Sequence, residues 1–170
     1  HHHNGILSHS IVPAPNSADL QPVAQDYITR LLNHLNYVGV LTLELFVTEQ
    51  GLYANEMAPR VHNSGHWSIE GAVCSQFENH IRAVAGLPLG STDVVRPTVM
   101  INIIGQHPKT EDVLALDGAH LHLYNKTERQ GRKLGHITLM PVDATQLTTL
   151  CRQLAKILPE PLALTQDMNI

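Results

Sequence analysis

Two glutamates interrupt apolar, β-rich stretches in which a lone carboxylate would be costly. Glu44 lies inside residues 40–47, and Glu56 lies near the end of residues 52–57. Burying an unpaired carboxylate in a strand costs several kcal/mol, and two opposed carboxylates also repel each other. A divalent cation removes both costs. Because the pair offers oxygen ligands and no cysteine, we expect Mg²⁺ or Mn²⁺, with phosphate oxygens and waters as further ligands.

Whether the two carboxylates meet depends on the register of the β-hairpin that residues 37–47 and 52–57 predict. They face each other if a three-residue link ends at Gly51 in a left-handed conformation. A two-residue turn at Glu49 and Gln50 would instead place them on opposite faces. The alternative, which spacing alone favours, is a solvated hairpin face on which Glu44 contacts nothing.

A loop of hydrogen-bonding residues follows the second strand directly. These residues are Arg60, His62, Asn63, Ser64 and His66. An arginine offers a fixed fork of donors to a carboxylate or phosphate. A histidine could donate to an oxyanion or move a proton near neutral pH. A polar surface loop is the alternative, and the proximity to Glu56 supports the functional interpretation.

A second polar cluster falls near the C-terminal end of the chain. Its members are Lys126, Arg129, Arg132, Lys133 and His136, which include four of the eleven lysines and arginines. Gly131 and Gly135 flank the central pair and could allow the backbone to approach a ligand closely. The cluster suits a phosphate or another small anion, and a solvated β-turn is the alternative.

The remaining pattern predicts the elements that carry these residues. We expect a short strand within residues 4–15, then an amphipathic helix that starts at Asn16 and Ser17 and packs on a core. A second helix should run from Ser68 to the cap at Gly86. Further elements are strands at 99–104, 120–124 and 133–140, a helical turn at 111–116 and a closing helix after Asp143. The order favours an α+β fold with a first part at residues 4–90 and a small β-rich part with a terminal helix at 91–170.

The composition limits the class of protein. The chain has 170 residues, of which 43% are hydrophobic and 15% charged, and a net charge of −4, so we expect a folded core and no binding of nucleic acid. No apolar run is long enough for a transmembrane helix, so we expect no membrane partner. Cys74 and Cys151 are too few for a disulfide framework, which favours a reducing cytoplasm.

The strongest motif is the string NEMAPRVHNSGHW at residues 55–67. It resembles the signature of the N5-carboxyaminoimidazole ribonucleotide synthase family, the ATPase subunit of phosphoribosylaminoimidazole carboxylase, within the ATP-grasp superfamily. The strings YVGV at 37–40, SQFE at 75–78 and GRKLGH at 131–136 are similar to the same family. The resemblance runs from about residue 4 to the C-terminus. It implies the C-terminal part of an ATP-grasp domain, followed by the small β-rich domain.

The resemblance also implies an activity. ATP would phosphorylate bicarbonate to carboxyphosphate, and this intermediate, or CO₂ released from it, would carboxylate the amine of aminoimidazole ribonucleotide in purine biosynthesis. The implied cofactors are ATP and Mg²⁺, and the implied assembly is a homodimer. The implied positions are Glu44 and Glu56 for the metal, these two with Asn55 for the nucleotide, Arg60, His62 and Asn63 for catalysis on bicarbonate, and Lys126, Arg132 and Lys133 for the ribonucleotide.

The family enzyme is roughly twice as long as this chain, because the resemblance lacks its N-terminal domain and the first part of its ATP-grasp domain. We therefore expect a piece of a longer polypeptide that has little or no activity alone. His1 to His3 fit either a purification tag or native residues. The rival interpretations are another ATP-grasp carboxylate–amine ligase and a non-catalytic binding module that retains the scaffold.

Overall fold

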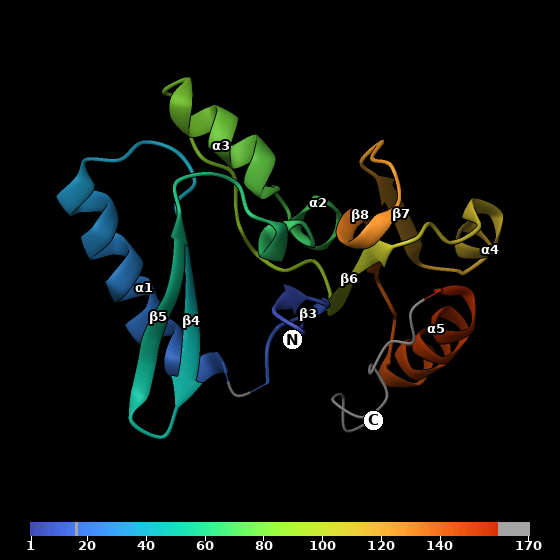
Figure 1. The fold of residues 1–170 in the computed structure, drawn as a ribbon. Helices are drawn as coiled ribbons and strands as arrows, with labels where there is room; N and C mark the ends of the chain where they lie inside the picture. Colours follow the sequence, from blue (N-terminus) through green and yellow to red (C-terminus); the bar gives the residue numbers. More distant parts are fainter. Residues whose placement is uncertain (16, 160–170) are drawn as a thin grey trace. The chain divides into compact units, whose positions relative to one another are not determined.

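The computed structural model describes residues 1–15 and 17–159, which form two compact units (Figure 1). The hairpin unit comprises Pro13–Asp93, and the sheet unit comprises His1–Val12 together with the chain from Val94 onward. This division departs from the predicted 4–90 and 91–170 mainly at the N-terminus. Its physical cause is β3 (His9–Val12), which pairs antiparallel with β6 (Thr98–Gly105). Asn16, half of the predicted helix start, lies outside the described residues.

The sheet unit contains a four-stranded antiparallel sheet in the order β3-β6-β8-β7. Strands β7 (Ala119–Leu123) and β8 (Arg129–Leu139) form a hairpin, and β1 (His2–His3) and β2 (Ile6–Leu7) form a small separate ribbon. Two helices complete the unit, α4 (Thr110–Leu114) and α5 (Ala144–Ile157). Every element predicted after residue 98 is therefore present, although β8 begins earlier than expected.

The hydrophobic core of the sheet unit lies between the sheet and α5. Ile101, Ile137 and Leu154 are completely buried there, and Cys151 packs among them with 2% of its surface exposed. Asp143 caps α5, because its Oδ1 accepts a hydrogen bond of 2.7 Å from the Gln146 N–H. The amphipathic pattern of the last helix thus directs its apolar face to this core, as the sequence predicts.

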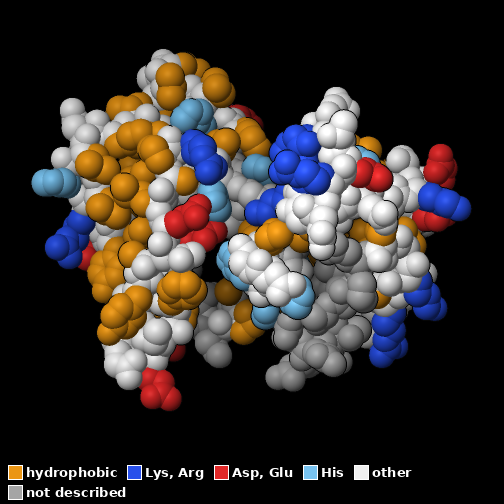
Figure 2. All heavy atoms as spheres, in the orientation of Figure 1, with side chains coloured by type: hydrophobic (Ala, Val, Ile, Leu, Met, Phe, Trp, Pro, Cys, Tyr) orange, Lys and Arg blue, Asp and Glu red, His pale blue; other side chains and the backbone are white. Residues whose placement is uncertain are grey.

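The hairpin unit has less core of its own. Helix α1 (Ser17–Leu35) runs beside the hairpin of β4 (Thr42–Thr48) and β5 (Gly51–Ala58), yet none of its residues is buried (Figure 1). An open groove of about 500 Å³, lined mainly by Tyr27, Leu31, Leu43 and Leu45, separates the two. The expected core-facing stripe is therefore only half-buried. Figure 2 shows hydrophobic side chains gathered on the face of this unit that is in view.

The predicted second helix is interrupted. The chain forms a 3₁₀ turn (Asn63–Gly65), the short α2 (Ser68–Gly71), and then α3 (Gln76–Val84). Ala72 is extended, with φ −116° and ψ 155°, and the Ser75 side chain starts a new helix by accepting a hydrogen bond from the Glu78 N–H. The prediction of one helix from Ser68 to Gly86 is wrong. The apolar pattern continues through this segment, but the extended Ala72 ends α2 and the Ser75 cap begins α3. Among the helices described, none has the length and apolar character needed to span a bilayer.

Candidate functional site

The two glutamates singled out from the sequence are directly opposed on the β4–β5 hairpin. Glu44 is the cross-strand partner of Glu56. The strands are nevertheless joined by the two-residue turn at Glu49 and Gln50, because Thr48 pairs with Gly51. A β-bulge at Asn55 reconciles the two observations, since this extra residue shifts the register between the turn and Glu56. The prediction that a two-residue turn would separate the carboxylates is therefore wrong.

Glu44 is held by its neighbours and is not on a freely solvated face. Its Oε2 accepts a hydrogen bond of 3.1 Å from Asn55 Nδ2, and its Oε1 lies 3.5 Å from His62 Nδ1. The Glu44 side chain is 15% exposed, whereas that of Glu56 is 52% exposed. The bulge places Asn55 and Glu56 together opposite one residue, so the carboxylate at Glu44 has both an amide partner and a second carboxylate beside it.

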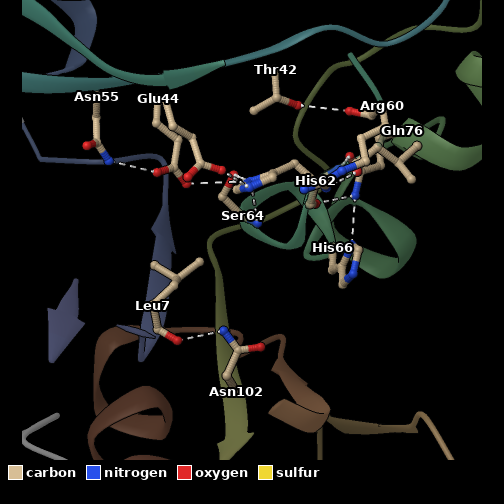
Figure 3. A network of polar contacts seen from close by, with 12 residues as sticks. Leu7, Thr42, Glu44, Asn55, Arg60, His62, Ser64, His66, Gln76 and Asn102 are labelled. Atoms are coloured by element: carbon tan, nitrogen blue, oxygen red, sulfur yellow. Dashed lines mark hydrogen bonds and ion pairs between the residues drawn. The ribbon is translucent and has the colours of Figure 1, made fainter. Parts of the chain in front are cut away.

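The His62 ring contacts both carboxylates, one through each nitrogen, and Figure 3 shows it beside Glu44. Its Nε2 is 3.0 Å from Glu56 Oε1, and its Nδ1 accepts from the Ser64 N–H and lies 2.8 Å from Ser64 Oγ. With a proton on Nε2, the ring donates to Glu56, and its Nδ1 accepts from the Ser64 N–H. The residue is 9% exposed, so its ring is fixed from several sides.

Gln76, the first residue of α3, fastens the His62 loop to the rest of the unit. Its Oε1 accepts from the His62 N–H at 3.0 Å, and its Nε2 donates to the His62 carbonyl at 2.8 Å. The same Nε2 lies 2.8 Å from His66 Nδ1. In the sequence Gln76 stands out only as part of the string at 75–78, which predicts no role for it. Fourteen residues separate Gln76 from His62, so no local pattern could reveal the contact.

Arg60 lies shortly before His62 in the sequence, and Asn63 directly follows it. Arg60 is exposed, and its Nη1 donates to the carbonyl of Val61 at 3.0 Å. Its own carbonyl accepts from Thr42 Oγ1 at 3.3 Å, which ties the start of the loop to β4. Asn63 begins the 3₁₀ turn. Of the three predicted catalytic residues, His62 is the one whose contact with Glu56 the described part of the structure gives.

The carboxylate pair fits part of a magnesium site. Two opposed carboxylates supply hard oxygen ligands, which Mg²⁺ prefers together with phosphate oxygens and water. Across residues 1–15 and 17–159, no group of three or more His, Cys, Asp and Glu side chains is arranged to hold a metal ion by itself. An ion at Glu44 and Glu56 would therefore need further ligands beyond these two side chains, for which phosphate oxygens and water are suited.

The predicted basic cluster lies in the sheet unit, around the β7–β8 connection. Lys126 Nζ is 5.2 Å from the centroid of the Tyr124 ring, and the Tyr124 hydroxyl is 2.7 Å from His136 Nδ1. Arg132 Nη1 donates to Thr127 Oγ1 at 3.1 Å, and Lys133 follows it in β8. Aromatic and hydroxyl groups therefore hold two of the three cations predicted to bind the ribonucleotide.

Three residues of that stretch have structural functions that the spacing did not reveal. His136 is 1% exposed and stacks on His122, with ring centroids 4.4 Å apart, so it belongs beneath the cluster. Gly135 allows close approach of backbone to backbone, because a Cβ there would collide with the His122 carbonyl oxygen. Gly131 has φ +70°, a conformation that favours glycine in the loop.

Comparison with protein families divides the chain in two. Residues 1–77 match the ATP-grasp domain, and residues 98–149 match the phosphoribosylaminoimidazole carboxylase C-terminal domain. The N5-carboxyaminoimidazole ribonucleotide synthase of Pseudomonas aeruginosa is 55% identical over 146 residues, which cover 86% of this chain and 40% of that enzyme. The Vibrio vulnificus (strain YJ016) enzyme is 51% identical over 94% of this chain and 42% of its own length.

Solved structures give the same relationship. N5-carboxyaminoimidazole ribonucleotide synthetase from Thermus thermophilus superimposes with a TM-score of 0.90 at 51% identity, over 94% of this chain and 45% of that one. An Aspergillus clavatus relative, solved with ADP and 5-aminoimidazole ribonucleotide, gives 0.82 at 34% identity, over 92% and 45%. The chain thus spans about two fifths of the length of the curated relatives it matches. The predicted α+β fold, part of an ATP-grasp domain followed by a small β-rich domain, is confirmed.

Proposed function

Because this chain belongs to the N5-carboxyaminoimidazole ribonucleotide synthase family, we propose that it forms the C-terminal part of an ATP-grasp ligase of purine biosynthesis. The enzyme would carboxylate 5-aminoimidazole ribonucleotide with bicarbonate and ATP, through carboxyphosphate. The observation that carries this proposal is the opposition of Glu44 and Glu56 with the His62 ring in contact with both. ATP use also has support from relatives solved with ATP or ADP.

Glu44 and Glu56 would hold Mg²⁺, or Mn²⁺, at the nucleotide. The ion would neutralise charge on the phosphate oxygens of ATP, which lowers the barrier to phosphoryl transfer. Asn55 would keep the Glu44 carboxylate in place through its 3.1 Å hydrogen bond and would border the nucleotide. These three residues therefore form the proposed metal- and nucleotide-binding edge of the hairpin.

Arg60, His62 and Asn63 would act on bicarbonate and on the carboxylated intermediate. The exposed guanidinium at Arg60 suits an anion, because its planar donors match two oxygens at once. The His62 ring is already oriented by Ser64 and Glu56, so its Nε2–H points at the carboxylate edge of the site. The ring is ordered in advance by these contacts, and donation to an oxyanion would take the Nε2–H away from Glu56.

Lys126, Arg132 and Lys133 would bind the phosphate of the ribonucleotide. Support comes from the contacts that orient Lys126 over Tyr124 and Arg132 on Thr127, and from the relative solved with 5-aminoimidazole ribonucleotide. We further propose that the complete protein is a cytoplasmic homodimer and that this chain alone has little activity. The free thiols of Cys74 and Cys151 are in keeping with a reducing compartment.

A chimera tests the proposal directly. The segment of the Pseudomonas aeruginosa relative that matches this chain is replaced by the corresponding residues of this chain, at 55% identity. We expect ADP and phosphate to form only when bicarbonate, Mg²⁺ and 5-aminoimidazole ribonucleotide are all present. The 170-residue chain alone serves as the comparison.

Two outcomes would contradict the proposal. A folded chimera that hydrolyses ATP equally well without the ribonucleotide would make the substrate assignment wrong and favour another ATP-grasp ligase. A folded chimera without Mg²⁺-dependent binding of ADP would favour a non-catalytic module. Thermal melting, compared with the unmodified relative, establishes that the chimera is folded.

A further inference from the structure

We propose that Gln76 is a positioning residue, which keeps the His62 ring in contact with Glu44 and Glu56. This inference rests on the proposed function, because it gives the catalytic loop a dedicated support. Gln76 stands at the first position of α3, directly after its Ser75 cap, and belongs to none of the site positions implied by the family resemblance. It would not touch substrate, and its effect would reach the site through His62.

The Gln76 side chain pairs with the backbone of His62 as a neighbouring strand would. Its Oε1 accepts from the His62 N–H at 3.0 Å, and its Nε2 donates to the His62 carbonyl at 2.8 Å (Figure 3). Two bonds to one residue fix the position and the direction of the backbone at His62. They also satisfy a backbone donor and acceptor beside a residue that is 9% exposed.

The orientation of the Gln76 amide is itself determined. Nε2 uses one hydrogen for the His62 carbonyl and the other for His66 Nδ1, which is 2.8 Å away. Rotating the amide by about 180° would exchange its donor and acceptor and lose both bonds to the His62 backbone. A glutamate at this position could accept from the His62 N–H but could donate to neither partner. Glutamine is therefore the side chain whose chemistry matches this place.

Gly65 supplies independent evidence for the same contact. A Cβ at Gly65 would lie 2.7 Å from Gln76 Oε1 and 2.9 Å from its Cδ, closer than carbon atoms pack. A Cβ at Gly65 therefore fits only if the Gln76 amide moves away from its present position. Ser68 Oγ donates to the Gly65 carbonyl at 2.6 Å and accepts from the Gln76 N–H at 3.0 Å, which completes the connection.

The hydrogen bonds from Gln76 determine how the His62 ring meets the two carboxylates. With its backbone held by Gln76, His62 presents Nε2 to Glu56 at 3.0 Å and Nδ1 to Ser64 Oγ at 2.8 Å. Without Gln76, the His62 ring would keep its contact with Ser64. The loop would lose the two hydrogen bonds that fix the position of the His62 backbone. A displaced ring would leave substrate binding largely unchanged and would slow the chemical step.

The experiment compares Gln76→Leu and Gln76→Glu, with Gln106→Leu as the matched control at an exposed glutamine of the sheet unit. In the chimera, we expect Gln76→Leu to lower kcat about 10- to 100-fold while KM for ATP changes less than about twofold. Gln76→Glu should fall between Gln76→Leu and the parent. Nitrogen NMR of labelled histidines in the 170-residue chain should show a single His62 ring form protonated on Nε2. Gln76→Leu should replace it by an averaged signal.

A double-mutant cycle separates this role from general loss of stability. Gly65→Ala should reproduce the kcat and NMR changes of Gln76→Leu, and the two changes combined should be little worse than either alone. Additive effects, or an unchanged His62 signal in a folded Gln76→Leu chain, would overturn the proposal. The NMR result does not require turnover. A chimera inactive toward the ribonucleotide would therefore contradict the proposed function while the positioning by Gln76 is still tested.

Discussion

Glu44 faces Glu56 across the β4–β5 hairpin because Asn55 is an extra residue in β5. A bulge of this kind places two residues of one strand opposite one residue of the other. Here Asn55 and Glu56 lie opposite Glu44, and both have side-chain oxygen atoms. The amide of Asn55 donates to the Glu44 carboxylate, so the most buried acid of the site has a partner before any ion binds. The same irregularity thus brings two carboxylates together and limits the cost of doing so.

Replacing Glu56 by glutamine should abolish the metal-dependent reaction and leave the fold intact. The substituted amide would keep an oxygen that accepts from His62 Nε2, but it would lack the negative charge that attracts the ion. We expect Mg²⁺-dependent binding of ADP to the chimera, measured by calorimetry, to weaken at least about tenfold, or ~1.4 kcal/mol. Unchanged affinity and turnover would remove Glu56 from the metal site. Glu49→Gln, in the exposed turn, is the charge-matched control.

Replacing Asn55 by aspartate should make the hairpin more dependent on Mg²⁺. The new carboxylate would stand where an amide now donates to Glu44 at 3.1 Å, so three acids would repel one another in the absence of the ion. We expect a lower Tm without Mg²⁺ and a larger rise in Tm on adding it. Asn55→Ala, which removes the hydrogen bond without adding charge, should lower Tm without increasing the response to Mg²⁺. Equal Mg²⁺ responses in the two variants would contradict a shared ion.

The sequence predicted the elements of this site better than their connections. The hairpin, the loop from Arg60 and the strands of the sheet unit follow from apolar alternation and turn residues. The bulge at Asn55 has no comparable signal, because an extra residue in a strand leaves its composition unchanged. Register could therefore be stated only as a choice between two turns, and the structure combines the shorter turn with the opposed glutamates.

Contacts between distant residues explain the other differences. The apolar period through residues 69–84 continued across the break at Ala72, so the sequence indicated one helix where two form. The pairing of β3 with β6 joins segments about 90 residues apart and moves the N-terminus into the sheet unit. Gln76 was likewise visible only as part of a familiar string. Residue types predicted the chemistry at Glu44, Glu56 and His62, and tertiary contacts supplied the support for it.

Gly135→Ala should destabilise the sheet unit strongly. A Cβ at this position would collide with the His122 carbonyl oxygen, and backbone on both sides of β8 leaves little room to move. We expect a loss of more than about 2 kcal/mol in the free energy of unfolding, measured with urea. Gly131→Asn is the control, because asparagine tolerates a positive φ and its Cβ would meet Ile6 Cδ1 at an ordinary 3.5 Å. Similar losses for both variants would show that the collision is not the cause.

Stability should decrease at alkaline pH because of one buried thiol. Burial raises the pKa of the Cys151 thiol to about 11. In the unfolded chain a cysteine thiol has a pKa of about 8.5, so above that pH the unfolded state loses a proton that the folded state keeps. The stabilisation is therefore complete below pH ~8.5 and is lost as the pH rises toward 11. Urea unfolding of the sheet unit from about pH 7 to 10.5 should show a shallower decline in Cys151→Ala than in the parent chain. Identical slopes would contradict this prediction.

Loss of the contact between Lys126 and the Tyr124 ring should weaken binding of the ribonucleotide phosphate. The ammonium group lies 5.2 Å from the ring centroid, and the Tyr124 hydroxyl is fixed by His136 Nδ1 at 2.7 Å. Tyr124→Leu removes both contacts, whereas Tyr124→Phe keeps the ring. A cation–π contact at an exposed site is worth about 0.5–1 kcal/mol, so we expect Tyr124→Leu in the chimera to raise KM for the ribonucleotide about two- to fivefold, with KM for ATP unchanged. Tyr124→Phe should have a smaller effect, and Lys126→Met should raise KM at least as much as Tyr124→Leu. If Lys126→Met leaves KM unchanged, the ribonucleotide phosphate is bound elsewhere.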